Sequence, residues 1–256
     1  MQIASDWNLD APLVIAHRGA SAYAPENTLP AFHLAGAMRA DAIELDAKLS
    51  ADGVVVIMHD PTLDRTTDGQ GPVGVCTLEE LKHLDAGSRF SKEYSGVRIP
   101  TLREVLAEIA AKFLVNIEMT NYTNPRDLLP EGVTALVKEF DLERKVLLSS
   151  FNPLALLRAR GLAPTIPLGL LVGKGQPLWQ RLVLRALIPH QAYHPFESVL
   201  RTSDIRGNHR RGRRVHVWTV NAESRIREIV RAGADGVITD VPDLARRVCD
   251  ESKPTS

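Results

Sequence analysis

Cysteine is scarce in this sequence. Only Cys76 and Cys249 occur among the 256 residues, far apart and without the spacing of a metal-binding motif. This argues against a disulfide framework and against a cysteine-ligated zinc site, and it fits a reducing compartment.

An excess of charge of one sign is also missing. The chain carries 31 Lys and Arg against 31 Asp and Glu, so no net field recruits nucleic acid or an anionic membrane. A local basic cluster lies between Arg206 and Arg214. We interpret it as the solvated end of a surface helix, and we expect no nucleic-acid partner.

Long apolar runs are absent as well. The most lipid-like stretch, Leu178–Pro189, contains Arg181 and Arg185 and is too short to span a bilayer. Residues Met1–Asp10 carry two acids and no basic n-region. We therefore expect a cytoplasmic protein without stable membrane insertion; the sequence leaves its oligomeric state open.

What the chain does have is a regular alternation of short β-branched runs with segments of helical period. This is typical of a parallel α/β fold, and eight such runs predict a (β/α)₈ barrel. The predicted strands are Leu13–Ala16, Ala42–Asp46, Leu114–Glu118, Val146–Ser149, Pro167–Leu171, Ala192–His194, Val215–Thr219 and Gly236–Ile238.

Cap residues mark the starts of three helices between these runs. Thr28 and Asn221 each precede a helical segment, and Thr101 is followed three residues later by Glu104, the pattern of a capping box. We predict helices that start behind these three caps.

One run breaks the alternation. Val54–His59 follows Ile43–Leu49 after only four residues, which is too short for a parallel crossover and predicts an antiparallel hairpin. Pairing Leu49 with Val54 sets Glu44 opposite His59 and Asp46 opposite Ile57. Because side chains alternate, Glu44, Asp46 and His59 would then share one face.

The stretch from Pro61 to Pro100 is rich in glycine and lacks the rhythm of the barrel. A segment of that length inside a compact barrel is more often a functional insertion than a plain loop. We predict one domain over residues 1–256, with a small insertion at about 61–100 over the barrel mouth.

Three acids follow the ends of predicted strands. Glu44, Asp46 and Glu118 supply oxygen ligands without nearby cysteine or paired histidine, which favours a hard divalent cation, Ca²⁺ or Mg²⁺, over zinc. The alternative is that these acids pair with arginines. We prefer the metal because an acid in an apolar strand is costly to bury without a strong partner.

Two histidines, His17 and His59, stand at strand ends beside these acids. Since the usual pKa of histidine is about 6.5, one ring can start neutral and the other protonated. General acid/base catalysis needs a base that takes a proton from the attacking group and an acid that gives one to the leaving group. We predict that the two histidines form this pair; which acts first stays open.

Further residues are candidates for substrate binding. Arg18 suits bidentate contact with a phosphoryl oxygen, or an ion pair with Glu26. Asn27 fits the same oxygens or a helix cap, and Trp218 fits a cover over the substrate or a barrel filling. His194 precedes Pro195 at another strand end, and we expect it to reach the mouth.

The order of these groups along the chain resembles one family. The motifs are His17-Arg18-Gly19, Pro25-Glu26-Asn27-Thr28, Glu44-Leu45-Asp46, His59-Asp60, Asp64-Arg65-Thr66-Thr67 and Trp218-Thr219-Val220-Asn221. From Val14 to Pro242 the chain resembles the glycerophosphodiester phosphodiesterases. The resemblance implies a metal-dependent TIM-barrel hydrolase that converts a glycerophosphodiester to glycerol 3-phosphate and an alcohol through a cyclic phosphate.

The sequence departs from this pattern at Thr120, where the family usually has a lysine facing the phosphate. We therefore expect greater reliance on Arg18 and the cation. Two alternatives stand beside the main interpretation. One is a lysophospholipase D with an apolar mouth built from Leu178, Trp179, Leu182, Leu184 and Leu187, although their helical spacing is more typical of a helix facing the core. The other is a catalytically silent relative that binds phosphodiesters.

Overall fold

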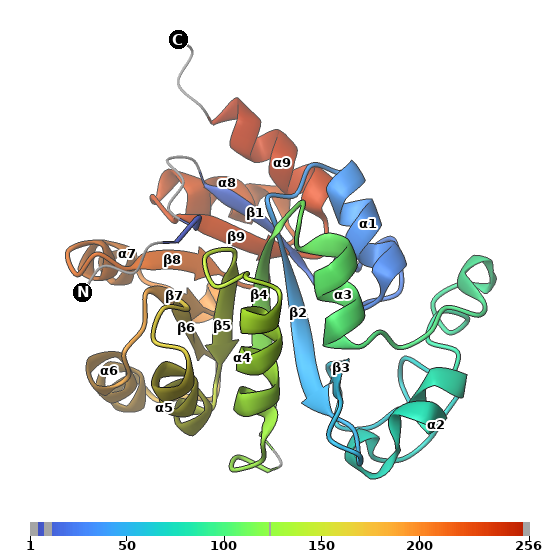
Figure 1. Ribbon diagram of the computed structural model, residues 1–256. Helices are drawn as coiled ribbons and strands as arrows, with labels where there is room; N and C mark the ends of the chain where they lie inside the picture. Colours follow the sequence, from blue (N-terminus) through green and yellow to red (C-terminus); the bar gives the residue numbers. More distant parts are fainter. Residues whose placement is uncertain (1–4, 8–11, 123, 253–256) are drawn as a thin grey trace.

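Eight parallel strands form a closed barrel in the computed structural model, which describes residues 5–7, 12–122 and 124–252. The strands follow one another in the order β1-β9-β8-β7-β6-β5-β4-β2, and β1 pairs with β2 to close the ring. Helices surround this ring (Figure 1). The strands are β1 (Leu13–His17), β2 (Ala42–Leu49), β4 (Leu114–Met119), β5 (Val146–Ser150), β6 (Leu168–Val172), β7 (Ala192–Pro195), β8 (Arg214–Val217) and β9 (Gly236–Thr239).

The barrel strands are buried along most of their length because helices cover their outer faces and side chains fill the interior. The predicted α/β barrel and its strands are confirmed to within one or two residues for nearly all strand ends. The surrounding helices are α1 (Leu29–Ala37), α3 (Leu102–Ile109), α4 (Leu129–Glu139), α5 (Pro153–Leu162), α6 (Leu178–Leu187), α7 (Thr202–His209), α8 (Glu223–Arg231) and α9 (Pro242–Glu251).

The three predicted helix caps have different outcomes. Thr101 caps α3 as predicted, with its hydroxyl accepting from Glu104 N and the Glu104 carboxylate accepting from Thr101 N. Thr28 is the N-cap residue of α1, but its hydroxyl donates to Pro25 O at 2.6 Å. The prediction for Asn221 is wrong: α8 has Ala222 at its N-cap, and the Asn221 side chain bonds Asp240 instead.

The hairpin exists, but its predicted register is wrong by one residue. Strand β3 (Val55–Ile57) runs antiparallel to β2 with Leu49 opposite Val55 and Ala47 opposite Ile57. The reason is Ser50, whose N–H donates to Val54 O and whose hydroxyl accepts from Val54 N, both at 2.9 Å. This closes the turn one residue later than expected. Glu44 therefore does not face His59; it lies between β1 and β4, beyond the reach of β3.

The long segment between β3 and α3 contributes no strand to the barrel. It contains two 3₁₀ turns, η1 (Val73–Val75) and η2 (Lys92–Tyr94), and helix α2 (Leu78–His83). Figure 1 shows α2 beyond the arrowhead of β2, at the carboxyl end of the strands. The segment packs on a small apolar cluster of its own, formed by Val56, Met58, Leu63, Val73, Leu81, Ala86 and Ile99.

Helix α6 has an unusual orientation. Its arginines turn toward the protein: Arg181 donates to Val199 O and Arg185 to Asp204 Oδ1. The expectation that its apolar spacing faces the core is wrong, because most of those side chains are exposed, with Trp179 at 68% and Leu187 at 72%. Within the described part of the chain, no helix has the length and hydropathy needed to cross a bilayer.

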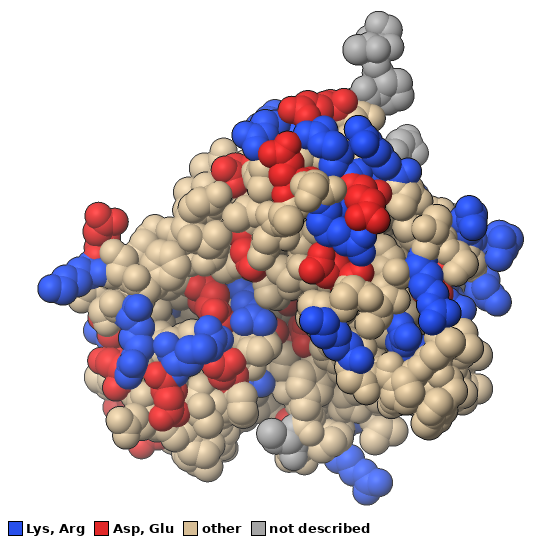
Figure 2. Space-filling view, turned by 180° about the vertical axis from the view of Figure 1, so that it is seen from behind, with Lys and Arg blue, Asp and Glu red and all other residues tan. Residues whose placement is uncertain are grey.

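Acidic and basic side chains are intermixed over the surface. Figure 2 shows both signs interspersed on one face of the molecule, in keeping with the balanced totals of the sequence. The surface charge therefore gives no single broad field, and the arrangement of charges that matters lies inside the barrel mouth.

Candidate active site

Three carboxylates converge at the carboxyl end of neighbouring strands. Glu44 and Asp46 project from β2 and Glu118 from β4, where Asp46 and Glu118 are paired in register. One ligand oxygen from each lies within 4.8 Å of the others. Glu44 and Asp46 are almost entirely buried. The strand alternation predicted in the sequence thus brings all three acids to one point.

The carboxylates of this acidic cluster are close enough to repel one another when they are ionised. Burial raises the pKa of Glu44 well above its usual range, and repulsion from Asp46 and Glu118 raises it further. Burial and then Asp46 raise the pKa of Glu118 in the same way. Oxygen-only ligands at this spacing, all acidic and close to one another, fit a hard divalent cation that would offset the repulsion.

Arg18 lies against the acidic cluster. Its backbone adopts a left-handed conformation, φ 57°, which lets its N–H donate to Glu44 Oε2 at 3.0 Å. Its guanidinium bonds Glu26 at 2.8 Å and lies 3.2 Å from Asp46 Oδ2. Burial disfavours this cation, but the charges of Asp46, Glu26 and Glu44 outweigh burial and raise the pKa of Arg18. Arg18 is therefore fixed as a permanent positive charge beside the cluster.

Asn27 holds Asp46 in place. Its Nδ2 donates to Asp46 Oδ2 at 2.8 Å, and its Oδ1 accepts from the Asp46 N–H at 3.2 Å. Asn27 therefore does not cap α1, one of the two roles that its position in the sequence suggested. The amide fixes the orientation of the carboxylate in the cluster.

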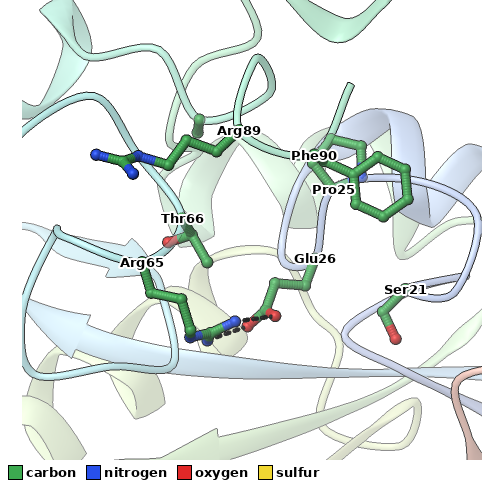
Figure 3. Close-up of a pocket in the computed structure, with 8 residues that line it drawn as sticks. Ser21, Pro25, Glu26, Arg65, Thr66, Arg89 and Phe90 are labelled. Carbon is green, nitrogen blue, oxygen red and sulfur yellow. Dashed lines mark hydrogen bonds and ion pairs between the residues drawn. The ribbon is translucent and has the colours of Figure 1, made fainter. Parts of the chain in front are cut away.

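Glu26 links the first barrel loop to the inserted segment. The Arg65 guanidinium donates two hydrogen bonds to the Glu26 carboxylate, of 2.6 and 2.8 Å, and a third to Asp60 Oδ2 at 2.5 Å. Figure 3 shows the paired Arg65 and Glu26 in a pocket of about 180 Å³ that is also lined by Ser21 and Phe90. The sequence motif Asp64-Arg65-Thr66-Thr67 therefore joins the insertion to the site.

Each of the two histidines has a carboxylate partner. His17 Nδ1 lies 2.6 Å from Asp240 Oδ1, and His59 Nδ1 lies 2.7 Å from Asp60 Oδ1. The bond from Arg65, with the help of His59, lowers the pKa of Asp60 to about 2. Burial would raise the pKa of Asp240, but His17 outweighs it and the pKa falls to about 2. In each pair, the contact at Nδ1 orients the imidazole ring.

Asp240 and Asn221 are site residues that sequence reasoning missed. Asp240 follows β9 directly, and β9 pairs with β1, which ends at His17. Asn221 donates to Asp240 Oδ2 at 2.6 Å and so fixes the carboxylate that orients His17. Closure of the predicted barrel could have identified Asp240 from the sequence. It places the residue after the last strand, Asp240, beside His17 at the end of the first.

Trp218 and His194 lie on or just after neighbouring strands but in different surroundings. Trp218 packs edge-on between Phe151 and Phe196 at the rim, and its Nε1 donates to His194 O at 2.9 Å. The prediction that His194 reaches the mouth is wrong. Its ring is fully buried in the barrel, where its Nε2 lies 3.1 Å from His216 Nδ1.

Beyond Glu118, the β4 strand end has two further contacts. The Tyr122 hydroxyl donates to Glu118 Oε1 at 2.5 Å. Thr120, the departure from the family pattern, is buried and accepts a hydrogen bond from Lys48 Nζ at 2.8 Å. Thr120 follows β4 at the position where the family usually has a lysine, and in this chain Lys48 of β2 contacts it instead.

A closed (β/α)₈ barrel with an acid cluster and two histidine–carboxylate pairs at its mouth defines the class: a hydrolase of phosphoric diesters. A family model described as the glycerophosphoryl diester phosphodiesterase family matches residues 17–244. The chain belongs to this family, and it is a glycerophosphodiester phosphodiesterase.

Relatives of similar length support this assignment. A glycerophosphodiester phosphodiesterase of Caldanaerobacter subterraneus subsp. tengcongensis is 42% identical over 234 residues, covering 90% of this chain and 95% of the relative. An Oleispira antarctica phosphodiesterase solved with the product sn-glycerol-3-phosphate superposes with a TM-score of 0.86 at 35% identity, over 94% and 97% of the two chains. A glycerophosphodiester phosphodiesterase from Agrobacterium tumefaciens gives 0.81 at 30% identity, over 92% and 99%.

Proposed function

We propose that this enzyme hydrolyses glycerophosphodiesters to glycerol 3-phosphate and an alcohol, using His17 and His59 as an acid/base pair. The observation that carries the proposal is the placement of two histidine–carboxylate pairs beside one acidic cluster. The glycerol 3-phosphate bound by the Oleispira relative supports the same product here.

Glu44, Asp46 and Glu118 would hold the divalent cation, Ca²⁺ or Mg²⁺. When bound, such an ion neutralises charge on the phosphoryl oxygens and favours ionisation of a nearby hydroxyl. Tyr122 and Asn27 would keep two of the three ligand carboxylates in place through their hydrogen bonds. The ligand set would thus be positioned before the substrate arrives.

The remaining groups act on the substrate itself. One histidine would take the proton of the glycerol 2-hydroxyl as that oxygen attacks phosphorus, and the other would protonate the departing alkoxide, so that a cyclic phosphate forms and the alcohol leaves. Water would then add to phosphorus and break the bond to the 2-oxygen, which gives glycerol 3-phosphate. Arg18 would bind a phosphoryl oxygen, with Glu26 and Asn27 holding it and the cluster in position. Trp218 would cover the glycerol at the rim, and the insertion at about 61–100 would complete the mouth.

Turnover of glycerophosphocholine or glycerophosphoglycerol, with and without chelator, tests the reaction and the ion together. Treatment with EDTA should abolish release of glycerol 3-phosphate, and Ca²⁺ or Mg²⁺ should restore it. Full turnover after thorough chelation would contradict the metal role. Binding of the diester without any turnover in the presence of either ion would support the silent relative instead.

The cyclic-phosphate route has its own test. A diester that lacks the free 2-hydroxyl of glycerol has no internal nucleophile, so it should bind without being cleaved. Hydrolysis of the 2-deoxy compound at a rate comparable to that of the natural diester would show that water attacks phosphorus directly.

A second candidate substrate is a lysophospholipid, and the exposed apolar face of α6 favours it. The helix follows the carboxyl end of β6, so Leu178 and Trp179 begin on the side of the mouth, where they could contact an acyl chain. Replacing Trp179 and Leu187 by Ser should then reduce turnover of lysophosphatidylcholine but not of glycerophosphocholine. Equal turnover of the lysophospholipid by both forms would rule out this role of α6.

A further inference from the structure

A separate cavity of about 550 Å³ is lined by Lys48 and Thr120, each two residues beyond an acid of the cluster, Asp46 and Glu118. Its walls come from the end of β2, the start of the insertion, and the connection from β4 to α4. The residues that matter here are Lys48, Ser50, Thr62, Asn121, Asn124 and Asp127. None of the site residues described above serves as its wall except Thr120, which contacts Lys48.

Lys48 continues the row of the metal-ligand acids. Glu44, Asp46 and Lys48 alternate along β2 and so point to the same side, with Lys48 about 7 Å beyond Asp46 toward the carboxyl end. On the neighbouring strand, Glu118 and Thr120 follow the same rule, and Asp46 pairs with Glu118. The cavity therefore begins at the next residue on the same face of each strand, directly beyond the acidic cluster.

The ammonium of Lys48 is held in a fixed position. It donates to Thr120 O at 3.2 Å and to Thr120 Oγ1 at 2.8 Å. The single hydroxyl proton of Thr120 is used on Ala47 O at 2.7 Å, so this oxygen can only accept from the lysine. An ammonium has three donors, and the third has no acceptor among the described residues, which leaves it for a ligand.

The two sides of the acidic cluster offer different chemistry. On the β1 side, a pocket of about 260 Å³ is lined by His17, Arg18 and Asp240 and suits the reacting phosphate and its glycerol. On the β4 side, the larger cavity offers one cation, amides, hydroxyls and the carboxylate of Asp127, beside an apolar wall of Leu49, Pro61, Pro72, Val73, Val75 and Leu129 that can contact the carbon skeleton of a ligand. This second side is where the leaving alcohol of a diester would extend from phosphorus.

Resting on the proposed function, we propose that Lys48 and this cavity bind the leaving alcohol and favour an uncharged polyol over a quaternary ammonium headgroup. Polyol hydroxyls can accept from Lys48 and donate to Asp127. A quaternary ammonium is recognised by aromatic faces, and the cavity has no aromatic ring in its described lining. Its charge would also be repelled by Lys48.

The experiment compares kcat/KM for glycerophosphoinositol and glycerophosphocholine in the wild type, Lys48→Met and a control, Lys92→Met, which changes a lysine outside the cavity. The wild type should prefer the inositol diester. Lys48→Met should lower kcat/KM for that diester by about tenfold to a hundredfold, the worth of a hydrogen bond to a charged group, and should change the choline diester much less. Lys92→Met should alter neither.

Two further measurements separate binding from folding. Free myo-inositol should inhibit the wild type more strongly than Lys48→Met, and Thr120→Val, which removes the hydroxyl that positions the ammonium, should shift selectivity in the same direction. If Lys48→Met loses the same factor on both diesters while inositol inhibition is unchanged, the inference is wrong and the hydrolase assignment stands. If wild-type enzyme cleaves neither diester with Ca²⁺ or Mg²⁺ present, the proposed function itself fails.

Discussion

Two pairs of histidines lie on or just after strands of the same sheet, yet their surroundings are opposite. His17 and His59 lie at the rim, where each Nδ1 contacts a carboxylate. His194 and His216 lie within the barrel, fully buried and bonded to each other. Burial lowers the pKa of His194 well below its usual range and that of His216 to about 4.

The difference shows that the partner of a histidine decides its use. An anion at Nδ1 orients the ring of a rim histidine and fixes its tautomer. A second histidine in a dry interior offers no such support, and the buried pair is kept neutral. We propose catalysis for the rim pair, whereas the interior pair suits packing.

The largest expected effect is on the rim pair. His17→Ala or His59→Ala should lower kcat by roughly 10² to 10⁴, the range for acid/base groups, while the thermal midpoint changes little because both lie at the mouth. The exposed His33 of α1 offers a matched control, and His33→Ala should retain kcat. A folded His17 or His59 variant with normal turnover would remove that residue from the mechanism.

The orienting carboxylate should matter next. Asp240→Asn keeps the shape but can present the wrong hydrogen-bonding atom to His17, so kcat should fall between about tenfold and 10⁴-fold with KM nearly unchanged. Asp243→Asn is the control, since that exposed acid bonds only the Tyr23 hydroxyl among the described residues. Unchanged kcat in Asp240→Asn would mean that His17 needs no oriented tautomer.

The interior pair, His194 and His216, should affect the free energy of unfolding rather than turnover. Since His216 has a folded pKa of about 4 and an unfolded one of about 6.5, the unfolded chain binds the extra proton between these values. Stability should therefore fall as pH drops from 6.5 to 4, by up to about 3 kcal/mol for this group. Urea unfolding at several pH values should show a shallower fall in His216→Gln; an identical slope would contradict a neutral interior pair.

The smallest expected effect concerns the space around His194. A Cβ on Gly169 would lie 2.8 Å from His194 Cε1 and 2.9 Å from Leu147 Cδ2, so Gly169→Ala should cost about 1 to 3 kcal/mol through overpacking. Gly161→Ala is the control because a Cβ there meets nothing within 4 Å. Equal unfolding midpoints for both variants would mean that the interior pair is loosely packed.

Sequence alone was enough for the barrel and for the acidic cluster. The runs around Ile43 and Val115 are apolar and β-branched, and alternation along a strand places Glu44 beside Asp46 on one face whatever the rest of the chain does. Parallel strands carry their carboxyl ends to one rim, so Glu118 had to join them. These outcomes depend on period and order, which are local properties.

Tertiary structure decided whatever depended on partners distant in sequence. The bond from His17 to Asp240 spans 223 positions, and only closure of β1 on β9 brings the two together. The hairpin register was set by a hydrogen bond to the hydroxyl of Ser50. Arg185 of α6 faces the protein because it forms an ion pair with Asp204 of α7. A pattern of residue types fixes which groups reach a rim or a face, but side-chain partners are chosen by packing in three dimensions.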